Sequence, residues 1–240
     1  MSSAPLITVR SIQLVVSDMA GTTVRDSGEV ARAFSAALAD HGVEASAQQI
    51  NAVRGASKRE AIATLIAPKY GADTTRVEAV YGSFKAHLQR VFTREAEPVA
   101  GAVETFAWLR ERGIKLALNT GFDRDITGLL LDALGWRGVA DAVICGDDVP
   151  QGRPAPYMIF RAMEATGTTN VRQVLNIGDT VSDLQAAYNA GVAVSVGVLS
   201  GAHQQEQLMR EPHTHLVASI AALPALMRAL PRSAPSLHET

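Results

Sequence analysis

The chain has 240 residues, of which 47% are apolar and 19% charged, and its formal net charge is -2. This size and composition predict one large domain, or a large and a small one, around a sizeable core. The near-neutral charge excludes strong attraction to nucleic acid or to an anionic membrane. The single cysteine, Cys145, excludes an internal disulfide and is typical of a reducing compartment. Residues 1–10 lack a secretory signal pattern, and no uncharged apolar run reaches the ~18 residues of a membrane span, so we expect a cytoplasmic protein.

The first predicted element is a short strand. Ile12 and 14–16 are apolar, and this run ends at Asp18. A small, hydroxyl-rich turn follows at once, with the sequence Met-Ala-Gly-Thr-Thr at 19–23. An open α/β sheet presents a carboxylate in this way at the carboxyl end of a strand, where ligands bind in such sheets.

The next segment is predicted to be helical almost throughout. Helical patterns cover 30–41, 58–67 and 77–92, and no convincing strand interrupts them. Because the segment separates the first strand from the rest of the sheet, we interpret residues 27–97 as an inserted helical cap. Residues 1–26 and 98–240 are then expected to form the core.

Beyond residue 98 helical and extended patterns alternate, which is typical of parallel βαβ units. We expect strands at 114–118, 142–145, 174–177, 192–196 and 216–217. We expect helices at 101–112, 125–134, 156–166, 184–189, 204–209 and 219–230, and a loose tail at 231–240. The predicted fold is therefore an α/β, Rossmann-like parallel-sheet core with an inserted α-helical cap.

Polar residues stand at or just beyond several of these strand ends. They are Asp18, Thr120, Arg153 and Asp179. Because the carboxyl ends of parallel strands share one edge of the sheet, we expect these side chains to converge. A phosphoryl centre needs a nucleophile and donors for its oxygens. Asp18 can form an aspartyl phosphate, Thr120 offers a hydroxyl and a backbone N–H, and Arg153 offers a planar fork.

The same edge offers hard oxygen ligands that suit Mg²⁺. We expect them to be Asp179, Asp183, Asp18 and the carbonyl of Ala20. Asp183 has a structural alternative, since a carboxylate also favours the first turn of the following helix. Many phosphate-handling sequences carry an acid two residues after the nucleophile, but Ala20 has no proton to give. Either the protein is inactive, or its leaving group needs no carboxylic acid.

These motifs, in this order, resemble the haloacid dehalogenase superfamily of phosphotransfer enzymes. The resemblance covers 14–23, 118–121, 152–156 and 176–183, with the cap between the first two. It implies a core that holds Mg²⁺ and the phosphoryl group beneath a mobile cap. We also expect Thr22 and Gly121, which lie in the same motifs, to contact the phosphoryl group.

The cap contributes a candidate lysine. Ser57 and Glu60 have the spacing of a capping box, which places Lys58 at the first helical position. A cation beside the positive end of a helix is disfavoured by about 0.3–1 kcal/mol. Arg54, Arg59 and partial burial also favour the neutral amine, the form that attacks a carbonyl. The alternative is a solvated lysine on the cap surface.

The Asp-x-Ala-Gly-Thr-Thr motif, Arg153 and Lys58 together resemble the phosphonatase branch of the superfamily. The resemblance implies an imine between Lys58 and a substrate aldehyde. This imine accepts the electrons of the broken C–P bond as an enamine, so the acid missing at Ala20 is not needed.

Three positions depart from the phosphonatase pattern. Ala61 stands where that branch has His, Gly28 where it has Cys, and Arg54 where it has Met. These positions surround the substrate and leave its carbon skeleton open. Arg54 either binds a further anionic group or only lowers the pKa of Lys58.

The sequence thus predicts a Mg²⁺-dependent hydrolase that cleaves the C–P bond of phosphonoacetaldehyde or a close 2-oxo phosphonate. We expect a monomer or homodimer with a small-molecule substrate and no nucleic-acid or membrane partner. A phosphomonoesterase is the first alternative, because 178–183 resembles ordinary phosphatases. A silent protein that binds phosphorylated ligands is the second. His203 is isolated in the sequence and is expected on the surface.

Overall fold

We describe the fold from a computed structural model, which defines residues 12–230 apart from the side chains of 93–95. The predictions for residues 1–10 and for the tail at 231–240 lie outside the described residues. Between residues 12 and 230, none of the helices is long and apolar enough to cross a membrane.

The core contains a six-stranded parallel sheet in the order β3-β2-β1-β4-β5-β6. Its strands are β1 (Leu14–Asp18), β2 (Lys115–Asn119), β3 (Ala142–Ile144), β4 (Val174–Gly178), β5 (Val194–Val198) and β6 (His215–Val217). β1 lies between β2 and β4, with Asp18 opposite Asn119 and Ser17 opposite Ile177. This pairing places the ends of β1, β2 and β4 side by side, as predicted.

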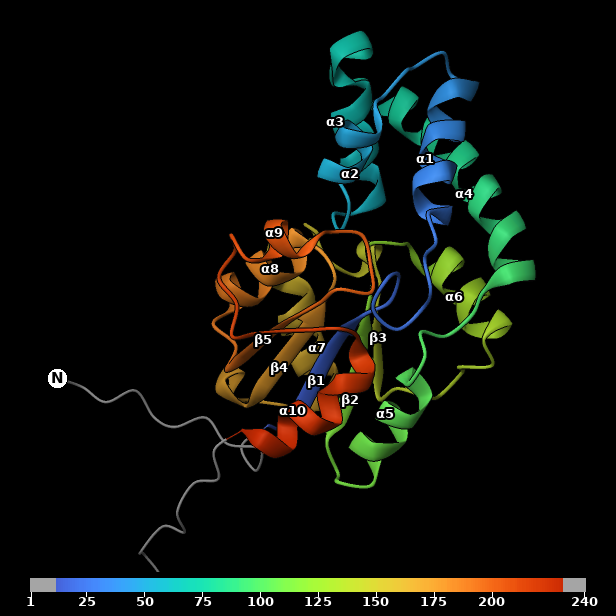
Figure 1. The fold of residues 1–240 in the computed structure, drawn as a ribbon. Helices are drawn as coiled ribbons and strands as arrows, with labels where there is room; N and C mark the ends of the chain where they lie inside the picture. Colours follow the sequence, from blue (N-terminus) through green and yellow to red (C-terminus); the bar gives the residue numbers. More distant parts are fainter. Residues whose placement is uncertain (1–11, 231–240) are drawn as a thin grey trace, which may run out of the picture.

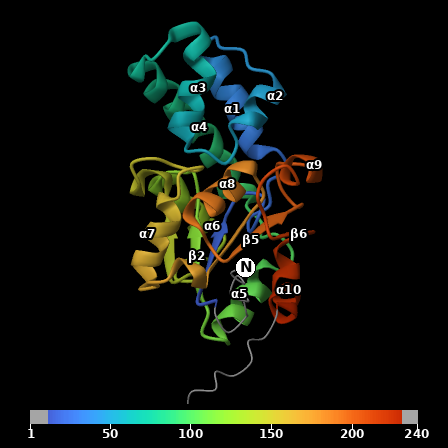
Figure 2. The same cartoon turned by 90° about the vertical axis from the view of Figure 1, so that its left-hand side faces the viewer.

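Helices cover both faces of this sheet (Figures 1 and 2). The core helices are α5 (Ala102–Arg110), α6 (Arg124–Ala133), α7 (Tyr157–Thr166), α8 (Val181–Ala190), α9 (Gln205–Leu208) and α10 (Leu223–Ala229). Short 3₁₀ turns lie at Gly146–Asp148, Val171–Gln173 and Ile220–Ala222, so the helix predicted at 219–230 is divided in two. The predicted fold class, an α/β Rossmann-like parallel sheet, is confirmed.

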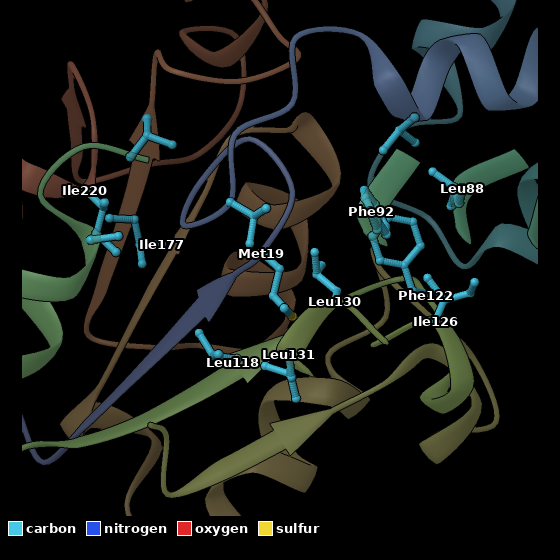
Figure 3. Packing of buried hydrophobic residues seen from close by; sticks show 14 of the residues in the cluster. Met19, Leu88, Phe92, Leu118, Phe122, Ile126, Leu130, Leu131, Ile177 and Ile220 are labelled. Atoms are coloured by element: carbon cyan, nitrogen blue, oxygen red, sulfur yellow. The ribbon is translucent and has the colours of Figure 1, made fainter. Parts of the chain in front are cut away.

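Alternation along β1 determines which helices it packs against, because successive side chains of a strand point to opposite faces. Leu14 and Val16 belong to a buried cluster with Met158 of α7 and Ala186 of α8. Val15 belongs to the larger cluster on the other face, which includes residues of α5, α6 and α10. Figure 3 shows part of this second cluster, including Met19, Leu118 and Leu130. The buried strand therefore holds Asp18 rigidly at its end.

The cap is a group of helices beyond the carboxyl ends of the strands (Figures 1 and 2). It contains α1 (Glu29–Asp40), α2 (Ala47–Ala52), α3 (Lys58–Tyr70) and α4 (Thr74–Glu95). Its interior is aromatic, and the Phe34 and Phe84 ring centroids lie 4.5 Å apart. We did not predict α2, although Ser46 and Gln49 form a full capping box at its start.

The cap joins the core through two antiparallel linkers. The Arg25 N–H donates to the Glu97 carbonyl and the Val99 N–H donates to the Thr23 carbonyl, both at 2.8 Å. Val24 forms an antiparallel bridge with Pro98 between these bonds. The division into a core of residues 1–26 and 98–240 and a cap of 27–97 is our proposal, and this linker pair is its natural boundary.

Candidate active site

The strand ends and the cap enclose a small cavity of about 20 Å³. Most of the predicted site residues line it: Asp18, Ala20, Arg54, Lys58, Thr120, Gly121, Arg153 and Asp179. The other two, Thr22 and Asp183, contact members of this group. A cavity of this size holds about one water molecule, so the cap is closed over the site.

Asp18 is buried at the end of β1 and is 5% exposed. Its Oδ1 accepts a hydrogen bond from Arg153 Nη1 at 2.7 Å, and its backbone carbonyl accepts from the Thr23 hydroxyl at 3.1 Å. Burial raises the pKa of Asp18 to about 6, although the guanidinium of Arg153 opposes the rise. A carboxylate that is dry, fixed and still ionised near neutral pH is suited to act as a nucleophile.

Arg153 bridges two carboxylates. Its Nη1 contacts both Asp18 and Asp183, and the side chain is 3% exposed. We predicted that its fork would face phosphate oxygens, but in this structure it pairs with acids. Among the described residues, its buried Nε has no hydrogen-bond partner. An N–H group buried without an acceptor is costly, so this atom is a ready donor for an anionic oxygen.

Thr120 differs in part from its prediction. Its backbone N–H donates to the Ile144 carbonyl at 2.9 Å, so the sheet uses this group and it is not free for a phosphoryl oxygen. Its Oγ1 accepts from the Phe122 N–H at 3.2 Å, which leaves the hydroxyl proton to donate. Among the described residues the Gly121 N–H has no acceptor, and it is the available backbone donor of this turn.

Asp179 is fully buried and held by a loop that we did not predict to be part of the site. Its Oδ2 accepts from the Ala202 N–H at 2.6 Å, and its backbone carbonyl accepts from the His203 N–H at 3.3 Å. Its Oδ1 accepts from the Thr22 hydroxyl at 3.4 Å. A Cβ on Gly201 would collide with the Asp179 carboxylate, so glycine is required where this loop passes. The Gly in Leu-Ser-Gly-Ala-His was the one sequence signal for this close approach.

Asp183 has the structural role that we gave as its alternative. It forms a capping box with Thr180 at the start of α8, and its Oδ2 accepts from the Thr180 N–H at 3.0 Å. Its Oδ1 contacts Arg153. Both carboxylate oxygens therefore already have protein partners, Arg153 and Thr180.

The acidic group fits a divalent cation by its chemistry. Burial, with the charges of Asp18 and Asp183, raises the pKa of Asp179 to about 8. A Mg²⁺ ion prefers such oxygen ligands and would offset this repulsion. Within residues 12–230, no three acidic, imidazole or thiol groups are already arranged as a metal cage. The oxygen donors for such an ion are present on Asp18, Asp179 and Asp183.

Lys58 begins α3 and is 7% exposed, so it is not a solvated surface lysine. Its Nζ donates to the Ala56 carbonyl at 3.3 Å and lies 5.1 Å from the Phe122 ring centroid. Burial lowers the pKa of Lys58 to about 8, and Arg153 and Arg54 add to this effect. Ser57 caps the helix by accepting from the Glu60 N–H at 3.3 Å. The reciprocal bond of the predicted capping box is absent from the described residues.

Arg54 lies in the loop before Lys58 and forms an ion pair with Asp26. Asp26 also accepts from the Gly28 and Val30 N–H groups, at 3.0 and 3.3 Å. Although burial opposes the change, Arg54 lowers the pKa of Asp26. The linker thus fixes the orientation of Arg54, and sequence reasoning missed Asp26 as its partner.

The site combines carboxylates at the strand ends, a buried arginine and an inserted helical cap. This combination is typical of one family of hydrolases. The chain belongs to the haloacid dehalogenase-like hydrolase family, whose model matches residues 12–191. It is 32% identical over 207 residues to the phosphonoacetaldehyde hydrolase of Hahella chejuensis, covering 80% of this chain and 70% of that protein. The chain is therefore a phosphonatase-like hydrolase.

Solved structures support the same fold. A phosphonoacetaldehyde hydrolase like protein from Oleispira antarctica matches with a TM-score of 0.82 at 20% identity, covering 96% of each chain. A "predicted phosphoglycolate phosphatase" from Haemophilus somnus matches with a TM-score of 0.74 at 18% identity, covering 90% of this chain and 98% of the other. At these identities the likeness extends to the fold alone.

Proposed function

We propose that this hydrolase is Mg²⁺-dependent and cleaves the C–P bond of phosphonoacetaldehyde or a close 2-oxo phosphonate. The observation that carries the proposal is that a buried lysine and a buried strand-end carboxylate line the same cavity. Lys58 and Asp18 both line that cavity, and Ala20 occupies the place two residues after the nucleophile. We further propose a small-molecule substrate, a cytoplasmic location, and a monomer or homodimer without nucleic-acid or membrane partners.

The first step joins Lys58 to the substrate. The neutral amine attacks the carbonyl carbon, and with the uptake of one proton from solvent the carbonyl oxygen leaves as water, which gives a protonated imine. The lowered pKa of Lys58, to about 8, supplies the neutral amine near physiological pH. The aromatic ring of Phe122 lies beside Nζ, with its centroid 5.1 Å away.

The second step breaks the C–P bond. Asp18 attacks phosphorus through a carboxylate oxygen, and the bonding electrons move to carbon and are delocalised into the iminium as an enamine. The enamine is then protonated at carbon, and hydrolysis of the imine releases acetaldehyde and restores the amine. Water hydrolyses the aspartyl phosphate and releases phosphate.

The remaining hydrogen-bond donors of the site bind the phosphoryl oxygens. Arg153 Nε, the Thr120 hydroxyl and the Gly121 N–H are the donors available for this purpose, and Thr22 orients Asp179. Asp18, Asp179, Asp183 and the Ala20 carbonyl are the proposed Mg²⁺ ligands. The bound ion would neutralise charge on the phosphoryl group.

Borohydride trapping tests the proposal. The protein is incubated with phosphonoacetaldehyde, reduced with borohydride, digested and analysed by mass spectrometry. We expect a reduced adduct on the peptide that contains Lys58, and we expect Lys58→Ala to lose both the adduct and most of the phosphate release. The matched control is Lys69→Ala on the same helix, because Lys69 lies at its far end. Phosphate release that survives Lys58→Ala would contradict the imine.

A phosphomonoesterase is the second candidate, favoured by the ordinary phosphatase pattern at 178–183. Under that reading small phosphate esters are turned over and Lys58→Ala keeps most of the activity. The absence of an acid at Ala20 argues against it. If neither phosphonates nor phosphate esters are turned over, a protein that only binds phosphorylated ligands is what remains.

A further inference from the structure

His203 connects the cap to the core, contrary to the prediction of a surface position. It is 5% exposed, and its two ring nitrogens contact different parts of the molecule. Nδ1 accepts a hydrogen bond from the Val181 N–H at 2.9 Å, and Nε2 lies 3.1 Å from the Asn51 carbonyl oxygen. Val181 begins core helix α8, whereas Asn51 lies near the end of cap helix α2.

These partners determine the protonation of the ring. A backbone N–H can only donate and a carbonyl can only accept, so Nδ1 must be bare and Nε2 must carry the proton. The ring is then neutral, which agrees with the lowering of the His203 pKa by burial. The first of these bonds satisfies a helix-end group, since the first N–H groups of a helix lack partners within it. The Asn51 carbonyl also accepts from the Arg54 N–H at 3.2 Å, so His203 adds a second donor to it.

The contact made by His203 lies beside residues of the proposed active site. The His203 backbone N–H donates to the carbonyl of Asp179, and its neighbour Ala202 donates to the Asp179 carboxylate. On the cap side, Asn51 starts the short segment 51–58, which ends at Lys58. The same loop therefore holds a proposed metal ligand and the start of the segment that carries the lysine (Figures 1 and 2 show α2 facing the α8–α9 end of the core).

The rest of segment 51–58 lies against the core with little space. The Ser182 hydroxyl donates to the Arg54 carbonyl at 3.3 Å, and the Lys58 N–H donates to the Gly121 carbonyl at 3.2 Å. A Cβ on Gly55 would collide with the Thr180 side chain. Among the described residues, His203 is the only histidine whose ring contacts both the start of core helix α8 and the end of cap helix α2.

We propose that His203 is a positioning residue that holds segment 51–58 in its closed position through the hydrogen bond to Asn51. Closure then presents Lys58 to the substrate that Asp18 attacks. The kinetic part of this proposal rests on the proposed function, but the contact itself does not.

Two conservative variants separate the halves of the contact. In His203→Asn the side-chain oxygen replaces Nδ1, so the bond from Val181 is kept and the bond to Asn51 is lost. In His203→Gln the side-chain NH₂ reaches the position of Nε2, so the bond to Asn51 is kept. His203→Ala loses both.

Hydrogen exchange of the resting protein, without substrate, measures closure directly. We expect the amides of 51–57 to exchange about fivefold faster in His203→Ala and His203→Asn, because a hydrogen bond of ordinary net strength changes an equilibrium constant by roughly this factor. His203→Gln is expected to match the native protein. His87→Ala, on cap helix α4, is the control and is expected to leave these amides unchanged.

Kinetics give the second measurement. With the substrate identified by the trapping experiment, we expect His203→Asn to lower kcat/KM about fivefold with a smaller change in kcat, and His203→Gln to restore it. Native-like exchange of 51–57 in His203→Ala, or equal behaviour of the Asn and Gln variants, would overturn the proposal. Because exchange is measured without substrate, failure of the proposed chemistry leaves that result intact and shows separately as a missing Lys58 adduct.

Discussion

The amine nitrogen of Lys58 lies 5.1 Å from the ring centroid of Phe122, so a cap side chain rests on an aromatic residue of the core. Phe122 in turn contacts Phe92 of α4 edge-on, with ring centroids 5.6 Å apart (Figure 3). Lys58 is therefore buried between the cap and the core in this structure. We therefore expect the reactivity of Lys58 to depend on the position of the cap, because the contact with Phe122 helps to bury the amine.

The pH dependence of trapping follows from the burial of Lys58. Its pKa falls from 10.5 to about 8, so half of the amine is neutral near pH 8 instead of near pH 10.5. We expect the rate of borohydride trapping to rise with pH and to level off above about pH 8. A midpoint near 10.5, measured by quantitative mass spectrometry across pH 6–11, would show that the lysine is solvated.

Arg54→Met is expected to move this midpoint upward, because the Arg54 charge lowers the Lys58 pKa. Arg54 is already paired with Asp26, so we expect KM for phosphonoacetaldehyde at high pH to change little. The control is Arg59→Met, since Arg59 lies outward and pairs with Glu78. If Arg54→Met instead raises KM at every pH, Arg54 binds an anionic group of the substrate.

Gly121→Ala is expected to damage activity without unfolding the protein. The added Cβ would collide with the Ala56 carbonyl and lie 3.2 Å from Lys58 Nζ, so segment 51–58 cannot keep its position against the core. We expect kcat/KM to fall at least about tenfold, because small misplacements of reacting groups are costly. Thermal unfolding should change little. Gly128→Ala, within helix α6, is the control, and its activity should match the native protein.

Ala20→Asp tests whether the missing acid selects the chemistry. A carboxylic acid at this place can protonate a leaving oxygen, and general acids contribute about 10²–10⁴-fold. We expect hydrolysis of glycerol phosphate to rise about 10²-fold, measured as phosphate release. Ala20→Asn has the same size but no acidic proton and should show no gain. Equal rates for the two variants would mean that position 20 does not reach the leaving group.

The buried Asp179 predicts how stability varies with pH in metal-free buffer. Its pKa is raised to about 8, so between pH 4 and 8 the folded state binds more protons than the unfolded state. Stability must therefore fall as pH rises through this window. We expect Asp179→Asn to raise the melting temperature by at least about 2–4 °C at pH 8, the shift for 1 kcal/mol in a chain of this size. At pH 4 the two proteins should melt alike, and a variant that melts lower at pH 8 would contradict the repulsion.

The sequence was sufficient for the sheet because each strand is a short apolar run that ends in a polar turn. The same reasoning brought Asp18, Asp179 and Lys58 to one site, and the structure places all three in the lining of one cavity. It could not pair Arg153 with Asp183, because the two are 30 residues apart and meet only through folding. His203 was misjudged for the same reason, since Asn51 is 152 residues away.

Helix α2 was missed for a different reason. It has six residues, too few for helical periodicity to show, and only the Ser46 and Gln49 capping pair marks it. The prediction that the Thr120 backbone N–H is free for a phosphoryl oxygen was wrong, because this N–H donates to the Ile144 carbonyl of the neighbouring strand. A motif identifies which groups are present, whereas the neighbouring strands decide which of them are free.

The paired linkers at Val24 and Pro98 mean that the chain leaves the core and returns to it at nearly the same point. The entropy cost of closing a loop grows only slowly with its length, so an insertion whose ends already meet is well tolerated. A short turn from 24 to 99 should therefore replace the whole cap and leave the parallel sheet intact. The parallel-sheet core and the inserted helices thus meet at one narrow junction, and Lys58 lies on the inserted side of it.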